Sequence, residues 1–151
     1  MKKARFVLLL AVALAGPCHA SCSAEAQAAA AAFMNDYLRH LLAVESGKSP
    51  RSSERWVLDS KAVSRRFKNT YKAFIKDPDQ GFDPLLDAQD FPNKGWIPAG
   101  CDAPGFVTLR TKPGDHLLLP VVVKILKNGN GWLIDGAGII NIPESKRPPG
   151  D

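Results

Sequence analysis

Apolar side chains in the first half of the chain recur every three or four residues, which is the spacing of one helix face. Residues 24–44 are rich in alanine and contain neither glycine nor proline, so they predict one long helix. The serines at 52–53 suit the cap of a short helical turn. A second long helix is then expected to begin at Asp59 or Ser60. Its apolar face consists of Val63, Phe67, Tyr71 and Phe74.

The second half of the chain changes to the pattern of β-strands. Residues 106–110 and 132–135 each predict a strand, and the apolar run at 117–127 predicts a longer one between them. The Asn-Gly-Asn-Gly sequence at 128–131 is a strong hairpin signal. Together these segments predict an antiparallel meander, with residues 139–140 as candidates to extend it.

A polar stretch at residues 83–92 separates the two halves. Asp83 followed by Pro84 predicts a cap and a single helical turn that ends near Ala88. We expect this stretch to be anchored by inward-facing Leu85, Leu86 and Phe91. Three prolines and three glycines within residues 91–105 predict a long loop before the first strand.

Helices followed by an antiparallel sheet are typical of the α+β class. We predict two long N-terminal helices packed on the meander, in a cone whose mouth could hold a ligand. The length of 151 residues suits one domain, which we place at residues 24–142. The proline-rich residues 143–151 are expected to form a flexible tail.

The N-terminus has the pattern of a secretory signal peptide. Three cations in the first five residues precede an apolar run at 6–15, which is too short to span a bilayer. We assign residues 1–20 to the signal, with a cut as late as Ala26 as an alternative. Lipidation at Cys18 or Cys22 is less favoured, because neither cysteine lies in a good lipobox. We therefore expect a periplasmic or secreted protein without a transmembrane anchor in its mature chain.

Most of the net positive charge belongs to the leader. The chain has 20 Lys and Arg against 15 Asp and Glu, and three of those cations lie in the first five residues. The mature chain then has 17 basic and 15 acidic residues, which is too little net charge to favour a nucleic-acid partner. A basic face on the second helix is interpreted as a solvated surface. It consists of Lys61, Arg65, Arg66, Lys68 and Lys72.

The cysteines suggest a disulfide. Cleavage after Ala20 would leave Cys22 and Cys101, and a pair in an oxidising compartment is usually joined. The alternative is that Cys22 is lost or disordered and Cys101 is a buried or free thiol. No Cys-x-x-Cys motif supports a redox centre or a cysteine zinc site.

Two segments resemble a known family. Asp-Pro-Leu-Leu-Asp-Ala-Gln-Asp-Phe at 83–91 and Trp-Leu-Ile-Asp-Gly at 132–136 are similar to the DUF3828 family of exported bacterial proteins. The resemblance covers roughly residues 30–142. It implies an NTF2-like, cystatin-like α+β fold. The family has no established activity, so the resemblance implies no catalytic or binding residue.

Candidate chemistry is sparse. After loss of the leader, the remaining histidines, His40 and His116, lie on different predicted elements, so we expect no metal site. We also expect no cofactor and no catalytic residue. Asp83 is expected to cap a turn. The candidate ligand-binding residues are Asp87, Gln89, Asp90, Trp96 and Arg110. For these five we favour structural or surface roles, with Gln89 and Asp90 bonded to backbone.

Three functions are compatible with this pattern. We predict first a non-catalytic exported binding module for an unknown small ligand or partner protein. The second hypothesis is an immunity-type protein that blocks a toxin. The third is a small hydrolase or isomerase with Asp87 or Asp90 as general base. The oligomeric state is left open, with a dimer among the options.

Overall fold

The computed structural model describes residues 22–77 and 81–149. Within these residues the chain is α+β, as predicted, with three α-helices and one four-stranded antiparallel sheet. The helices are α1 (Ala24–Glu45), α2 (Ser53–Asp59) and α3 (Arg65–Phe74). In sheet order the strands are β1 (Trp96–Ala103), β2 (Phe106–Thr111), β3 (Val121–Asn128) and β4 (Gly131–Ala137). The short 3-10 helix η1 spans Glu144–Lys146.

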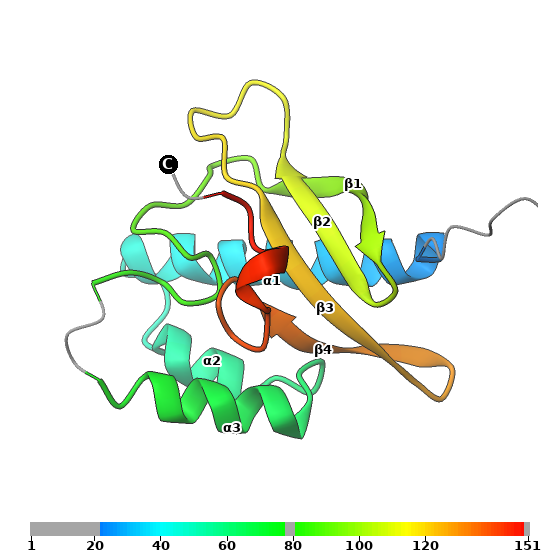
Figure 1. Cartoon of the computed structure of the whole chain (residues 1–151). Helices are drawn as coiled ribbons and strands as arrows, with labels where there is room; N and C mark the ends of the chain where they lie inside the picture. The colour runs from blue at the N-terminus through cyan, green and yellow to red at the C-terminus, as the bar shows by residue number, and fades with distance from the viewer. Residues whose placement is uncertain (1–21, 78–80, 150–151) are drawn as a thin grey trace, which may run out of the picture.

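The hydrophobic core lies between α1 and one face of the sheet. α1 crosses behind all four strands, and η1 lies in front of the sheet (Figure 1). Side chains alternate between the two faces of a strand. On β3, Val123 and Ile125 are at most 3% exposed, whereas Leu126 is 42% exposed. The described helices include none that is long and apolar enough to cross a membrane.

The second predicted helix is shorter than expected. Val63 forms a parallel bridge to Ile134 of β4, and the Ser64 amide donates to the Ile134 carbonyl at 2.9 Å. These bonds keep the chain extended until Ser64 caps α3. α3 therefore has 10 residues against 22 in α1, and the prediction of two long N-terminal helices is not confirmed.

Two predictions about the meander need correction. The expected loop at 91–105 contains β1, an edge strand that tolerates Pro98 and Gly100 because its register shifts between them. Conversely, residues 117–120 precede β3 instead of belonging to it. Pro120 has no amide hydrogen for a ladder bond, which explains the later start. The hairpin at 128–131 is confirmed.

The predicted disulfide is present. Cys22 and Cys101 are joined with a Cα–Cα distance of 5.9 Å, so the start of α1 is tied to β1. The predicted signal peptide and Cys18 lie outside the described residues. At the other end, the Arg147 side chain donates two hydrogen bonds to the Ile142 carbonyl across η1. Flexibility of this tail in solution remains a prediction.

Candidate functional site

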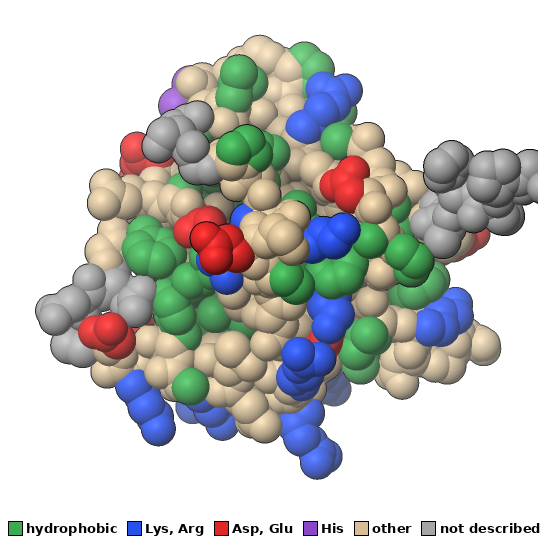
Figure 2. Space-filling model, viewed as in Figure 1, with side chains coloured by type: hydrophobic (Ala, Val, Ile, Leu, Met, Phe, Trp, Pro, Cys, Tyr) green, Lys and Arg blue, Asp and Glu red, His purple; other side chains and the backbone are tan. Residues whose placement is uncertain are grey.

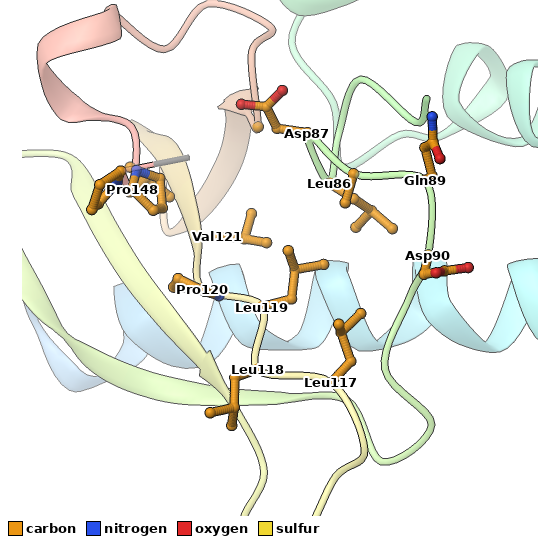
Figure 3. Close-up of a pocket in the computed structure, with 14 residues that line it drawn as sticks. Leu86, Asp87, Gln89, Asp90, Leu117, Leu118, Leu119, Pro120, Val121 and Pro148 are labelled. Atoms are coloured by element: carbon orange, nitrogen blue, oxygen red, sulfur yellow. The ribbon is translucent and has the colours of Figure 1, made fainter. Parts of the chain in front are cut away.

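A cleft of about 730 Å³ is the candidate site. Three segments that are distant in sequence form its walls: residues 86–90, residues 117–122 and the pair Pro148–Pro149. Gly138, just after β4, also lines it. Figure 3 shows these segments facing one another across the cleft.

The cleft has an apolar interior and a polar rim. The side chains of Leu86, Leu119 and Val121 lie in its middle (Figure 3). Gln89 and Asp90 point outward at the rim. Such an arrangement can hold an apolar group of a ligand, with carboxylates nearby for a positive charge.

Asp83 shapes the wall at residues 86–90. Its carboxylate accepts hydrogen bonds from the amides of Leu85 at 2.8 Å and Leu86 at 3.2 Å, and from the Tyr37 hydroxyl at 2.5 Å. The Asp83 amide donates to the Ala88 carbonyl at 2.8 Å, which closes the turn. Burial raises the pKa of Asp83, and burial together with the neighbouring Asp83 raises the pKa of Tyr37. Asp83 therefore has the expected capping role.

Trp96 and Asp115 hold the leucine-rich wall. The indole Nε1 of Trp96 donates to the Leu119 carbonyl at 2.8 Å. The Asp115 carboxylate accepts from the Asn93 and Lys94 amides at 3.1 and 2.6 Å. Burial alone would raise the pKa of Asp115, but these amide donors lower it to about 2. Trp96, at 1% exposure, thus supports the cleft from the core and is not one of the residues that line it.

The structure brings together three of the five candidate residues. Asp87, Gln89 and Asp90 are exposed at the rim, and within the described part of the chain their side chains make no hydrogen bond. The prediction that Gln89 and Asp90 bond to backbone is therefore wrong: both side chains are exposed, and the Leu85 and Leu86 amides of this segment donate to Asp83. Arg110 is exposed and lies outside the cleft, as expected of a surface charge.

Sequence reasoning missed two walls of the cleft. Residues 117–119 are three consecutive leucines, a pattern that predicts a strand, yet Leu118 is 81% exposed. An apolar run directly before a proline was the signal that the strand starts later. Pro148 and Pro149 belong to the predicted tail, and no sequence pattern places them beside the leucines.

A second polar cluster is buried between α3 and the sheet. Asp135 of β4 has a side chain that is 1% exposed, and its carboxylate accepts from the Ser64 hydroxyl at 2.7 Å. The Lys124 ammonium lies 2.8 Å from the other oxygen, and Arg66 approaches to 3.8 Å. Burial alone would raise the pKa of Asp135, but the Lys124 and Ser64 contacts outweigh it and lower the pKa. Ser64 also caps α3, so this cluster fixes the helix on the sheet.

We predict that Asp135→Asn lowers the free energy of unfolding by about 2 kcal/mol at neutral pH, since it removes a charge-assisted bond and leaves Lys124 unpaired. The folded-state pKa lies below the unfolded value of about 3.9, so this stabilisation exists above about pH 4 and is lost as pH falls. Urea unfolding at pH 7 and pH 3 tests this. The control Asp36→Asn breaks an exposed pair with Arg39 and should cost less than about 0.5 kcal/mol. Equal losses at both pH values for Asp135→Asn would contradict the prediction.

The described residues contain no group of three or more His, Cys, Asp or Glu side chains placed to hold a metal ion. His40 is buried and stacks on Trp56, with ring centroids 5.6 Å apart. His116 contacts Asp115 at 2.9 Å on the surface. The two histidines therefore belong to separate environments.

Comparison with protein-family models, curated proteins and solved structures finds no significant match to this chain. The resemblance to the DUF3828 family and to the NTF2-like fold stays a prediction.

Proposed function

We propose that the protein is an exported, non-catalytic binding module whose cleft takes an apolar group of a ligand that also carries a positive charge. The cleft itself is the observation that supports this proposal. Its middle is lined by leucine, valine and proline, and Asp87 and Asp90 are carboxylates on its rim. The charge complement of such a rim is a cation.

Export is supported by two independent features. The leader has the charge and hydropathy pattern of a signal peptide. The disulfide between Cys22 and Cys101 suits an oxidising compartment.

The long helix across an antiparallel sheet supports assignment to the NTF2-like fold, with the cleft in the role of the cone's mouth.

The burial of the carboxylates favours binding over acid–base catalysis. A general base needs a carboxylate that reaches a bound substrate. The carboxylates of half-buried Asp83 and buried Asp135 are occupied by capping bonds and by an ion pair, respectively. The carboxylates at the cleft, Asp87 and Asp90, are exposed at its rim.

The proposal predicts selectivity between two amphiphiles with the same tail. Calorimetric titration below the micelle concentration should show tighter binding of dodecyltrimethylammonium than of dodecyl sulfate, by about tenfold. The double variant Asp87→Asn, Asp90→Asn should remove this preference and leave the melting temperature unchanged. Asn suits position 87 because the residue there has φ of 56°. Glu45→Gln, an exposed charge at the end of α1, is the matched control.

The apolar part of the cleft is tested separately. Leu117→Ser should weaken binding of both amphiphiles about tenfold, because it removes apolar contact with the tail. Leu126→Ser removes a partly exposed leucine on β3, outside the cleft, and should have no effect. Binding that does not depend on Leu117 and does not distinguish the two head groups would contradict the proposed function.

A further inference from the structure

The exposed face of α3 has an unbalanced charge. Four of its ten residues are cations, Arg65, Arg66, Lys68 and Lys72, and the helix contains no acidic residue. Arg66 lies near Asp135, but the other three have no ion-pair partner among the described residues. Figure 2 shows Lys and Arg side chains along the lower edge of the molecule, where Figure 1 places α3.

Local electrostatics favour only one of these cations, Lys72, which lies in the last turn of α3, where the helix dipole attracts positive charge. Arg65 and Arg66 occupy the first turn of α3, where the helix dipole disfavours positive charge. Arg65, Lys68 and Lys72 follow one another at three- and four-residue spacing, so they repel each other. The other helices differ: Arg39 pairs with Asp36 on α1, and Arg55 pairs with Asp59 on α2.

We propose that α3 docks the protein on a bilayer surface through the phosphates of anionic phospholipids. The face carries several long, flexible cations, and no α3 residue lines either of the two described pockets, which suits many exchangeable phosphates more than one fixed anion. The cations of the helix span about 11 Å, which is short for tracking a nucleic-acid backbone. This inference rests on the proposed export, which would bring the protein into a compartment bounded by membranes.

Vesicle co-sedimentation tests this docking. The exported protein should bind vesicles of phosphatidylcholine with phosphatidylglycerol, and should not bind vesicles of phosphatidylcholine alone. Binding should be lost between about 0.1 M and about 1 M salt, because screening shortens from about 10 Å to about 3 Å. A DNA duplex at the same salt concentration serves as a competing polyanion.

Two matched double variants locate the surface. Arg65→Gln with Lys72→Gln should weaken partitioning to anionic vesicles by about 25-fold, since each cation near such a surface contributes about fivefold. Arg110→Gln with Lys112→Gln removes the same charge from exposed sites on and after β2 and should change partitioning by less than about twofold. Circular dichroism should show the same fold for both. The proposal would be overturned if the two double variants lost vesicle binding equally. It would also be overturned by equal binding to neutral and anionic vesicles, or by binding to DNA without binding to vesicles. Because Asp87 and Asp90 are unchanged in these variants, failure here leaves the cleft proposal intact.

Discussion

Gly138→Ala is expected to lower the free energy of unfolding by about 4 kcal/mol. Gly138 has φ of 56°, a conformation that alanine adopts at a cost of about 1 kcal/mol. In addition, an added Cβ would lie 2.3 Å from the Pro84 carbonyl oxygen and 2.6 Å from the Leu85 carbonyl. Backbone atoms cannot move aside as a flexible side chain can, so we expect a further cost of about 3 kcal/mol. Urea unfolding gives the comparison with the wild type.

Gly129→Ala separates the two contributions. Gly129, in the hairpin between β3 and β4, has nearly the same φ of 57°, but its Cβ would meet no atom within 4 Å. We therefore expect a loss of only about 1 kcal/mol there. Losses of similar size at both positions would show that backbone strain alone is responsible and that the close approach to Pro84 has no consequence.

Gly138→Ala also tests how the cleft is built. The Ile139 amide donates to the Pro84 carbonyl at 3.0 Å, so the end of β4 and the segment that carries Asp87 are packed together. Gly138→Ala should push this segment outward and weaken amphiphile binding while the sheet remains folded. Gly129→Ala should leave binding unchanged. A variant that is destabilised but binds normally would show that the position of the 84–90 segment does not determine the cleft.

The elements set by local pattern were predictable from the sequence. The alanine-rich helix α1 and the Asn-Gly-Asn-Gly hairpin formed as expected, because propensity and turn chemistry act over a few residues. β1 was not predicted because its prolines and glycines are typical of a loop. It forms a strand because it pairs with β2, which the local sequence does not indicate. The late start of α3 likewise depends on a bridge between Val63 and Ile134, which are 71 positions apart.

The candidate site was predictable only in part. The polar residues of the 83–91 segment were found from their density, and Asp87, Gln89 and Asp90 do lie at one rim. Which aspartate faces inward could not be read from the sequence, since it depends on the Tyr37 hydroxyl that meets Asp83. The walls at 117–122 and 148–149 come from tertiary packing, which no local pattern encodes.

Removal of the disulfide should have an effect as large as that of Gly138→Ala. Cys22 and Cys101 are 79 positions apart, and closure of a loop of that length contributes about 4 kcal/mol in the chain-entropy model. The double variant Cys22→Ala, Cys101→Ala should therefore melt roughly 10–15 °C below the wild type under non-reducing conditions. Reductant should lower the melting temperature of the wild type to that of the double variant. It should leave the melting temperature of the double variant unchanged. A wild type with two free thiols, or one that is insensitive to reductant, would contradict this prediction.

The disulfide also connects stability to compartment and processing. A loss of about 4 kcal/mol is a large part of the 5–15 kcal/mol that usually stabilises a domain, so the folded protein should accumulate where thiols are oxidised. Cleavage after Ala20 would retain both Cys22 and Ser23, whose hydroxyl accepts from the Ala26 amide and caps α1. Cleavage after Ala26 would remove the bridge and the cap together. Intact-mass measurement of the protein from a periplasmic or secreted fraction should therefore show the earlier cut and a mass two hydrogens below that of the free thiols. A chain that starts at Gln27 would exclude the bridge in the mature protein.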